Sequence, residues 1–476
     1  MSRLAADNSR QFLHRRGLFL VFSAIVFCLA LSVSYSIGVL PWQGVCLFLI
    51  LPPLLLLFLI RQEVLLLAIV VTYFGAGYFF SDLLAQSLIR VALLLLVGLM
   101  LVLRSGAKQS ITRIVTPLDR IVFLWLGIIL ISFFYGFYVK GNETYYLMGD
   151  LYKFVEIISV FWLTTFLVKT RKQIKLVLWG FLFAVFVFGA IDSMLFLTRA
   201  SLVGALAARI RAGAQFSSIF ALLLVVTLML HEKRIGRKII LAFLGFIFFF
   251  SFFISFLRTG YIAFPIALVV VLILYFCKHK ARALKGTMSF IFLFVFLLTF
   301  LAFFGIIIAN INPDIDIIEA TFTRLASLGG SATDDPLGVR VLEVRSIIND
   351  VLVKNPLLGN GLGGQYYSAI ETPEGLEWRL IHYIHINYFD FLARSGILGL
   401  LVFLLIAFKY LKDVTIFYLK AKDNFSQGVL LGSIGIFVAA AIIALSTSIF
   451  YSPLLFLIMA MSYCIAYCEK ITSRTL

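Results

Sequence analysis

The sequence predicts an all-α fold, a polytopic helical membrane protein of about 12–14 transmembrane helices with one large external loop that contains short helices. Hydrophobic residues make up 62% of the chain and charged residues only 13%, whereas soluble domains are about 45–50% apolar and about 25% charged. Apolar runs close to the roughly 20 residues that cross a bilayer recur from Gly17 to Tyr467. We therefore expect residues 1–476 to form a single membrane domain.

The apolar runs predict the order of the crossings. The first run follows the basic segment MSRLAADNSRQFLHRR without a convincing cleavage site, so we expect an uncleaved helix and a cytoplasmic N-terminus. From there the pattern predicts about fourteen helices. They lie near residues 17–39, 43–60, 64–80, 87–103, 121–138, 154–168, 175–197, 216–231, 239–257, 261–277, 287–310, 386–408, 429–450 and 454–468.

Positive charge falls in clusters, which accounts for the formal net charge of +17. Basic loops stay on the cytoplasmic side of membrane proteins, and the predicted crossings place every cluster on that side. The clusters are RSGAKQSITRIVTPLDR, KTRKQIK, EKRIGRK, KHKARALK and KYLKDVTIFYLKAK. The charge therefore requires no nucleic-acid partner. The cysteines lie in or beside apolar segments, which implies no disulfide framework and no Cys-based metal site.

One long connection on the opposite face, residues 311–384, is the expected functional segment, because long loops in compact proteins often carry binding or catalysis. The stretch VRVLEVRSIINDVLVKNPLLGNG within it predicts a helix that ends at Asn355-Pro356. Arg340 would stand at the N-terminal edge of this helix, where the dipole disfavours a cation, so we expect an anion from elsewhere to pair with it. The apolar residues at helical spacing are Val341, Val344, Ile348, Val351 and Leu352.

Cations at the external surface are the first candidate site residues. Arg258, in FFFSFFISFLRTGYIAF, stands between two apolar runs. A charge so close to hydrocarbon is costly unless it is paired or hydrated, which favours a functional role over snorkelling. Arg209, Arg211 and Arg345 are further candidate binding residues, against the alternative of ordinary loop arginines.

Two of the five histidines, His382 and His385, precede the apolar run of HYIHINYFDFLARSGILGLLVFLL. If the loop folds back over the helix ends, His385 can face Arg258 and Arg340 where an anionic lipid head group would dock. Imidazole can take a proton from a sugar hydroxyl near neutral pH, and guanidinium groups hold diphosphate oxygens in bidentate pairs. These groups suit glycosyl transfer from a lipid diphosphate. For His382 we expect only an interfacial residue hydrogen-bonded to backbone.

The stretch HINYFDFLARSGILGL, preceded by NPLLGNGLGG and GVRVLEVRS, resembles the O-antigen ligase and polymerase family of bacterial envelope proteins. His385, Asn387, Gly396 and Gly399 fill the family's signature of a His, a nearby Asn and a Gly-x-x-small step. Ile386 departs from it, because ligases usually carry Asn, Ser or Gln at that place.

Two arginines extend the resemblance to roughly residues 209–410. RTGYI resembles the family's Arg-x-x-x-Leu element, with Ile262 in place of Leu, and Arg340 occupies the position of a second arginine that precedes the His. The resemblance implies an inverting, metal-independent glycosyltransferase without a cofactor, on the periplasmic or outer face of the bacterial cytoplasmic (inner) membrane. Its donor would be an undecaprenyl-diphosphate-linked glycan. Its acceptor would be lipid A core in ligases or another lipid-linked repeat unit in Wzy-type polymerases.

The resemblance also implies residue roles. His385 would orient or deprotonate the acceptor hydroxyl, and Arg258 and Arg340 would clamp the diphosphate. Gly396 and Gly399 would allow close helix packing beneath the site. The candidate substrate-binding residues are Arg209, Arg211, Arg345 and Asn387.

Several alternatives stay open. A transporter or flippase for lipid-linked sugars would place charges near the bilayer midplane, where only Arg90, Glu156 and Asp192 occur, and would show repeats, which we do not find. His382 and His385 could bind a metal, but no third ligand is specified. GNGLGG, at Gly359, would be a flexible turn rather than a dinucleotide site. The remaining readings are solvated loop acids at Asp314 and Asp316, a chance NET pattern at Asn142, and an ion pair between Asp390 and Arg394.

Overall fold

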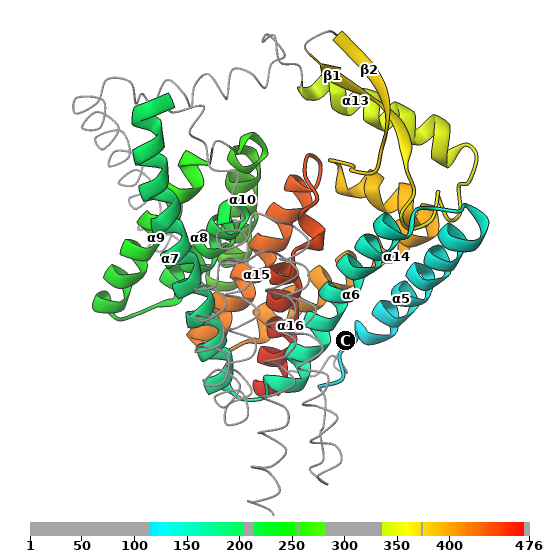
Figure 1. Cartoon of the computed structure of the whole chain (residues 1–476). Helices are drawn as coiled ribbons and strands as arrows, with labels where there is room; N and C mark the ends of the chain where they lie inside the picture. Colours follow the sequence, from blue (N-terminus) through cyan, green and yellow to red (C-terminus); the bar gives the residue numbers. More distant parts are fainter. Residues whose placement is uncertain (1–113, 204–213, 256, 281–335, 373–374, 471–476) are drawn as a thin grey trace, which may run out of the picture.

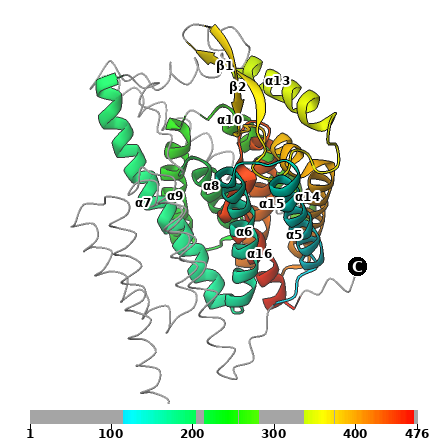
Figure 2. The same ribbon diagram turned by 45° about the vertical axis from the view of Figure 1, so that its right-hand side comes forward.

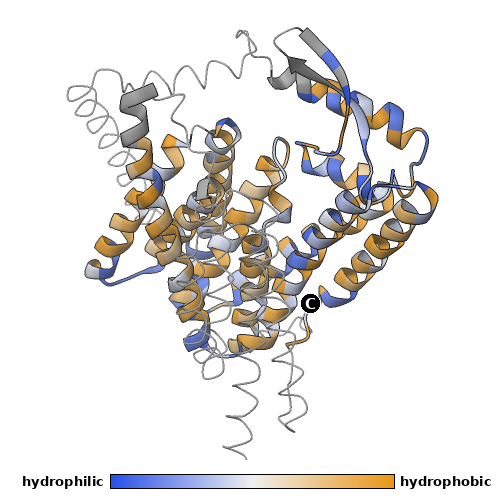
Figure 3. Cartoon of the chain, viewed as in Figure 1, coloured by the Kyte–Doolittle hydropathy of each residue, from blue (hydrophilic) through white to orange (hydrophobic). Residues whose placement is uncertain are grey.

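The computed structural model describes residues 114–203, 214–255, 257–280, 336–372 and 375–470. Six helices in these ranges are long and apolar enough to cross a membrane. They cover residues 119–139, 171–196, 235–254, 258–279, 387–420 and 424–443. Apolar residues dominate the bundle helices, and hydrophilic residues are frequent in the segment that caps one end (Figure 3). The prediction of an all-α polytopic membrane protein is confirmed.

Every predicted crossing that falls on described residues corresponds to a helix. The bundle helices are α5 (Asp119–Phe134), α6 (Thr144–Leu167), α7 (Arg171–Val203), α8 (Ala214–His231), α9 (Ile235–Ile254), α10 (Arg258–His279), α14 (Asn387–Lys420), α15 (Asn424–Ile443) and α16 (Pro453–Cys468). A π-helical turn, η1 (Tyr135–Val139), continues α5. The predicted crossings near 17–39, 43–60, 64–80, 87–103 and 287–310 lie outside the described residues.

The three largest differences from the predicted helix boundaries arise where polar side chains find partners inside the protein. Helix α6 begins at Thr144 rather than near residue 154, and the charged Asp150 in this added segment is buried. Helix α14 continues to Lys420 rather than 408, past an ion pair of 2.6 Å between Lys409 and Asp413. Helix α15 ends at Ile443 rather than 450, where Ser446 Oγ lies 3.2 Å from the Ile443 carbonyl oxygen.

Helices α15 and α16 lie in the middle of the bundle, between α7–α10 on one side and α5, α6 and α14 on the other (Figures 1 and 2). Helix α15 packs against α8 and α10, α16 against α6, and α14 against α5. Trp125 of α5 is fully buried, and its ring contacts Phe154, Phe391 and Phe456 of three other helices. Aromatic packing therefore fixes the end of α14 that precedes its kink.

A cap covers one end of the bundle, above α14 and α6 (Figures 1 and 2). It consists of α13 (Pro336–Ser346), the π-helical η3 (Ile347–Leu352), and an antiparallel hairpin of β1 (Tyr366–Thr372) and β2 (Gly375–Ile381). The predicted loop helix is present and ends before Asn355-Pro356. Its predicted apolar stripe is only partly right: Val351 is buried, but Val341 is 64% exposed and Ile348 41% exposed. Sequence patterns did not predict the hairpin.

The described basic loops share the other end of the bundle. Arg171, at the start of α7, lies 2.8 Å from Glu469 and 3.7 Å from Asp423. Lys278, near the end of α10, donates to the Ala421 carbonyl at 2.7 Å. These contacts join the loops after α6, α10, α14 and α16, so the charge pattern predicted their common side correctly.

Candidate functional site

Arg258 is the first residue of α10, at the capped end of the bundle. The first turn of a helix carries free N–H groups and a partial positive charge, which disfavours a cation there unless an anion is present. Gly260 lets this turn pack closely, because a Cβ at this position would lie 2.8 Å from the ring of Phe252 and 3.0 Å from Ile219. The dipole argument made for Arg340 therefore applies more strongly to Arg258, because Arg340 lies one turn inside α13.

The connection between α15 and α16, residues 444–452, ties α10 to the start of α14. The hydroxyl of Ser446 donates to Thr259 Oγ1 at 2.8 Å, and that of Ser448 donates to the Ile384 carbonyl at 3.0 Å. Asn387, the first residue of α14, donates its backbone N–H to the Ala444 carbonyl at 3.0 Å. Arg258 and His385 each adjoin a residue held by this segment, which brings them to the same end of the bundle.

Helix α13 brings Arg340 and Glu343 to that place. Burial lowers the pKa of the Arg340 guanidinium, Glu343 raises it, and the charge of Arg258 lowers it again. Glu343 is buried, and its Oε1 accepts the backbone N–H of His385 at 3.1 Å. His385 Nδ1 lies 3.3 Å from the same oxygen. The structure thus places Arg340 and His385 beside one buried carboxylate, and Arg258 close enough to Arg340 for their charges to repel.

A small apolar core holds this cluster in place. It consists of Ile347, Val351, Tyr366, Ile384 and Ala393, from η3, β1, the segment after β2, and α14. The hydroxyl of Tyr366 extends from this core and donates to Glu343 Oε1 at 2.7 Å. Since Ile384 is anchored here, the backbone of His385 is fixed although 44% of its side chain is exposed.

His382 belongs to a separate cluster around Arg394, which is buried between two carboxylates. Arg394 Nε donates to Asp390 Oδ1 at 2.6 Å, and its Nη1 contacts Asp150. Arg394 Nη2 donates to the His382 carbonyl at 2.9 Å, and Nη1 lies 3.1 Å from His382 Nε2. Burial and the nearby Lys153 lower the pKa of His382, so the neutral ring accepts from the guanidinium at Nε2. The predicted Asp390–Arg394 pair is present, with Asp150 as a third member.

Gly396 interrupts α14 with φ 64° and ψ −166°. A Cβ there would lie 2.1 Å from the carbonyl oxygen of Leu357. Gly399 faces the Ser395 side chain, where a Cβ would lie 1.8 Å from the hydroxyl oxygen. The close approach that needs glycine is thus made to the loop after η3 and within α14, not to a neighbouring helix as expected.

The glycine-rich segment, residues 355–365, is packed among helices rather than free. Gly359, Gly361 and Gly363 all have positive φ and closely approach the backbones of α14, η1 and α6. The Asn142 side chain donates to the carbonyls of Asn360 at 2.9 Å and Leu362 at 2.7 Å. The prediction of a flexible turn is wrong because left-handed backbone and neighbouring helices fix this segment.

The other candidate residues are placed as follows. Asn387 is fully buried, and its Oδ1 accepts the N–H of Phe450 at 2.8 Å, while its Nδ2 donates to no described residue. Arg345 is exposed on α13. Arg209 and Arg211 lie outside the described residues. Binding roles for all four stay predictions.

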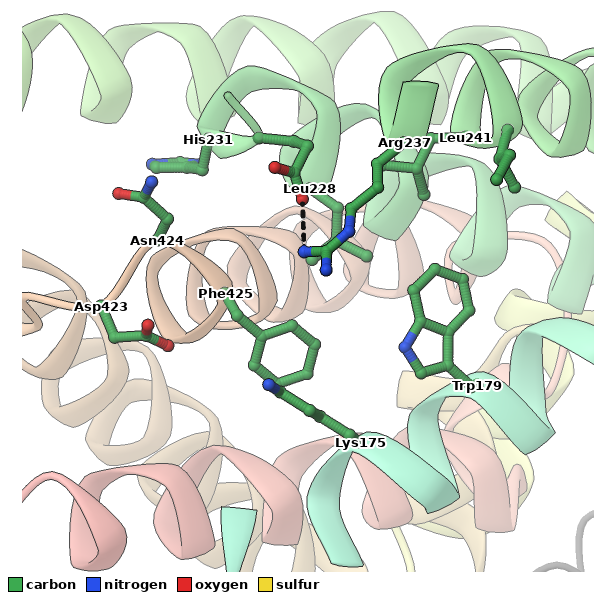
Figure 4. A pocket seen from close by; sticks show the side chains of 11 residues that line it. Lys175, Trp179, Leu228, His231, Arg237, Leu241, Asp423, Asn424 and Phe425 are labelled. Atoms are coloured by element: carbon green, nitrogen blue, oxygen red, sulfur yellow. Dashed lines mark hydrogen bonds and ion pairs between the residues drawn. The ribbon is translucent and has the colours of Figure 1, made fainter. Parts of the chain in front are cut away.

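Within the described part of the chain, no group of three or more His, Cys, Asp or Glu could hold a metal ion. A pocket of about 610 Å³ lies at the opposite, basic end of the bundle, between α7, α8, α9 and the start of α15 (Figure 4). Its cations are matched: Arg237 lies 3.4 Å from Glu232, and the Lys175 ammonium lies 5.2 Å from the centre of the Phe425 ring. Arg258, Arg340 and His385 lie at the capped end instead, so we take that end as the candidate active site.

Sequence reasoning missed Glu343, Tyr366 and Asp150. Glu343 had a usable signal, because it stands four residues before Ile347 and eight before Val351 and so shares their buried helix face. A carboxylate on an apolar face needs a partner. Tyr366 and Asp150 are recognisable only from tertiary contacts.

Part of the chain matches a known protein family. The Wzy_C family model, described as O-antigen ligase, matches residues 243–404. The matched segment begins in α9, ends in α14 and contains Arg258, Arg340, Glu343 and His385. A comparison with curated proteins finds no match.

Proposed function

We propose that the protein is a membrane glycosyltransferase of the O-antigen ligase and polymerase family, because the family model described as O-antigen ligase matches residues 243–404. Its donor is an undecaprenyl-diphosphate-linked glycan, and its acceptor is a saccharide hydroxyl, on lipid A core in a ligase or on another lipid-linked glycan in a polymerase. The gathering of Arg258, Arg340 and His385 at one end of the bundle carries this proposal.

The charge balance of the cluster favours an anionic donor. Two guanidinium groups lie near each other, and the one buried carboxylate beside them is already the acceptor for Tyr366 and His385. A diphosphate would supply the missing negative charge, and guanidinium forks match its oxygens in bidentate geometry. The free N–H groups at the start of α10 would add to the binding of an anion.

In the proposed reaction, the acceptor hydroxyl attacks the anomeric carbon of the donor and the bond from that carbon to the diphosphate oxygen breaks. The hydroxyl proton passes to Nε2 of His385, and the lipid diphosphate leaves with the bond's electron pair. Arg258 and Arg340 offset the charge that develops on the leaving diphosphate. A single displacement of this kind inverts the anomeric centre and needs no metal ion.

We place the protein in the bacterial cytoplasmic membrane with its N-terminus and basic loops in the cytoplasm and the capped end outside. The support is that the described basic loops share one end of the bundle, whereas Arg258, Arg340 and His385 share the other. A lipid-linked donor on the outer leaflet would then reach the cluster from the membrane surface.

The test is transfer by the purified protein in detergent and chelator, given an undecaprenyl-diphosphate-linked glycan with or without lipid A core. Addition to lipid A core identifies a ligase, and a ladder of lengthened lipid-linked glycan identifies a polymerase. We expect His385→Ala to lower kcat by about 10²–10⁴ while donor binding survives. Arg340→Lys should also impair turnover, because an ammonium cannot reproduce the guanidinium fork.

Arg379→Lys is the matched control, since Arg379 is exposed on β2 and pairs with Glu377 at 2.6 Å. It should turn over like the wild type. Wild-type rates in both His385→Ala and Arg340→Lys would overturn the assigned roles. Absence of transfer, with lipid-linked glycan instead crossing reconstituted vesicles, would replace the enzyme with a transporter.

A further inference from the structure

Glu343 is a buried acid for which the proposed reaction has no direct use. Only 2% of its side chain is exposed, and it lies on the inner face of α13 above Ile347 and Val351. Burying a carboxylate is expensive unless hydrogen bonds and nearby cations compensate for lost water. The groups that hydrogen-bond to the Glu343 carboxylate therefore indicate which neighbouring side chain it positions.

Its hydrogen bonds within the described part of the chain all converge on one oxygen. Oε1 accepts the Tyr366 hydroxyl at 2.7 Å and the backbone N–H of His385 at 3.1 Å, and His385 Nδ1 lies 3.3 Å away. Burial raises the pKa of Tyr366, and Glu343 raises it further, so the hydroxyl keeps its one proton, which is shared between Glu343 Oε1 and the Tyr383 carbonyl oxygen 2.8 Å away. Oε2 has no partner among the described residues, and a proton placed there would find no acceptor.

These contacts determine which nitrogen of His385 carries the proton. An ionised carboxylate can only accept, so Nδ1 must be the protonated nitrogen of the neutral ring. The lone pair is then at Nε2, which makes no hydrogen bond within the described part of the chain. With 44% of the side chain exposed, Nε2 is available to an incoming hydroxyl.

We propose that Glu343 is the positioning residue for His385, fixing the imidazole in the Nδ1–H tautomer and stabilising the imidazolium that forms when Nε2 takes a proton. This inference rests on the proposed role of His385 as the base. The proton comes from the acceptor hydroxyl and stays on Nε2, the Nδ1 proton stays on Nδ1, and Glu343 remains ionised throughout. Its contact with the His385 backbone N–H adds a second restraint, because ring and main chain are held by the same oxygen.

Glu343→Gln tests the proposal, since the amide keeps the size of the side chain and removes its charge. We expect kcat to fall about 10- to 100-fold with little change in donor KM. Without the carboxylate the imidazolium is less stable, so the acidic limb of the pH–rate profile should move to lower pH. Glu377→Gln on β2, whose side chain is 52% exposed, is the matched control and should leave both unchanged.

A second measurement is independent of transfer activity. Carbethoxylation of His385 by diethyl pyrocarbonate, followed by mass spectrometry across pH, reports the protonation of this ring directly. The pH of half-maximal reaction should fall in Glu343→Gln. It should rise in Tyr366→Phe, because the carboxylate loses a competing donor and becomes a stronger partner for imidazolium.

The two proposals can fail separately. If no transfer is found but the two variants shift the carbethoxylation midpoint in opposite directions, the contact between Glu343 and His385 stands and the proposed reaction does not. If transfer is found but both variants titrate like the wild type, Glu343 is only a buried structural acid. Thermal unfolding of each variant shows whether it is folded, and Tyr366→Phe keeps the test open if Glu343→Gln does not fold.

Discussion

Gly396→Ala is the sharpest test of the arrangement that supports the candidate site. The backbone at Gly396, φ 64° and ψ −166°, lies in a region that is essentially restricted to glycine, and placing another residue there costs about 1–3 kcal/mol. An added Cβ would also lie 2.1 Å from the oxygen and 2.2 Å from the carbon of the Leu357 carbonyl. These are backbone atoms that cannot rotate away, and overpacking of this kind costs about 1–3 kcal/mol more.

The two contributions predict a loss of about 2–6 kcal/mol in the free energy of unfolding. The assay is thermal unfolding of the detergent-solubilised protein, followed by tryptophan fluorescence, where we expect Tm to fall by several degrees. Gly127→Ala is the control. Gly127 lies within α5 with no atom within 4 Å of an added Cβ, and alanine is favoured there by about 1 kcal/mol.

Gly127→Ala should therefore leave Tm unchanged or slightly raised. If Gly396→Ala unfolds at the same temperature as Gly127→Ala, then neither the positive φ nor the contact with Leu357 constrains this position, and the kink in α14 must have another cause. If Tm falls but transfer at a permissive temperature is normal, the kink supports stability alone and does not orient the segment that follows His385.

Arg394→Gln should lower the free energy of unfolding by about 3–5 kcal/mol, because it leaves the buried Asp390 without its ion-pair partner and Asp150 with only Lys153; a Tm close to wild type would contradict this. His382 has a pKa lowered by burial, so the unfolded chain binds more protons below its ordinary pKa of about 6.5. Stability should fall as the pH drops through that range, and the fall in Tm should be smaller in His382→Gln. Asn142→Ala removes two side-chain hydrogen bonds to the glycine-rich segment, which should cost about 1–3 kcal/mol, measured in the same unfolding assay.

Hydropathy located the helices well because each spans lipid or core with a long apolar run. It placed the start of α6 ten residues late, since Asp150 and Lys153 lower the local hydropathy although Asp150, 3.2 Å from the Lys153 ammonium, is buried. The hairpin was missed although β2 alternates apolar and charged residues in LEWRL, because β1 shows no matching alternation.

Sequence patterns can identify two kinds of candidate site residue: residues that belong to a recognised family signature, and residues that pair with a neighbour close in the chain. Arg258, Arg340 and His385 were identified in this way, and the pair of Asp390 and Arg394 followed from helical spacing. Asp150 could not be found, because it meets Arg394 across a separation of more than two hundred residues. Partners of that kind are determined by packing of whole helices, for which a single sequence carries no local signal.

The contacts of the glycine-rich segment determine whether the matched region, residues 243–404, can be expressed as a separate fragment. Residues 355–365 lie inside the segment that the O-antigen ligase family model matches, yet their hydrogen-bond partners include Ser132, Asn142 and Asp150, which precede it. Residues 243–404 are therefore a region of sequence similarity, but they do not form an independently folding domain. A fragment expressed between them would leave Arg394 without Asp150 and the glycines without the helices they touch. Domain-swap chimaeras between relatives should accordingly exchange α5 and α6 together with the matched segment.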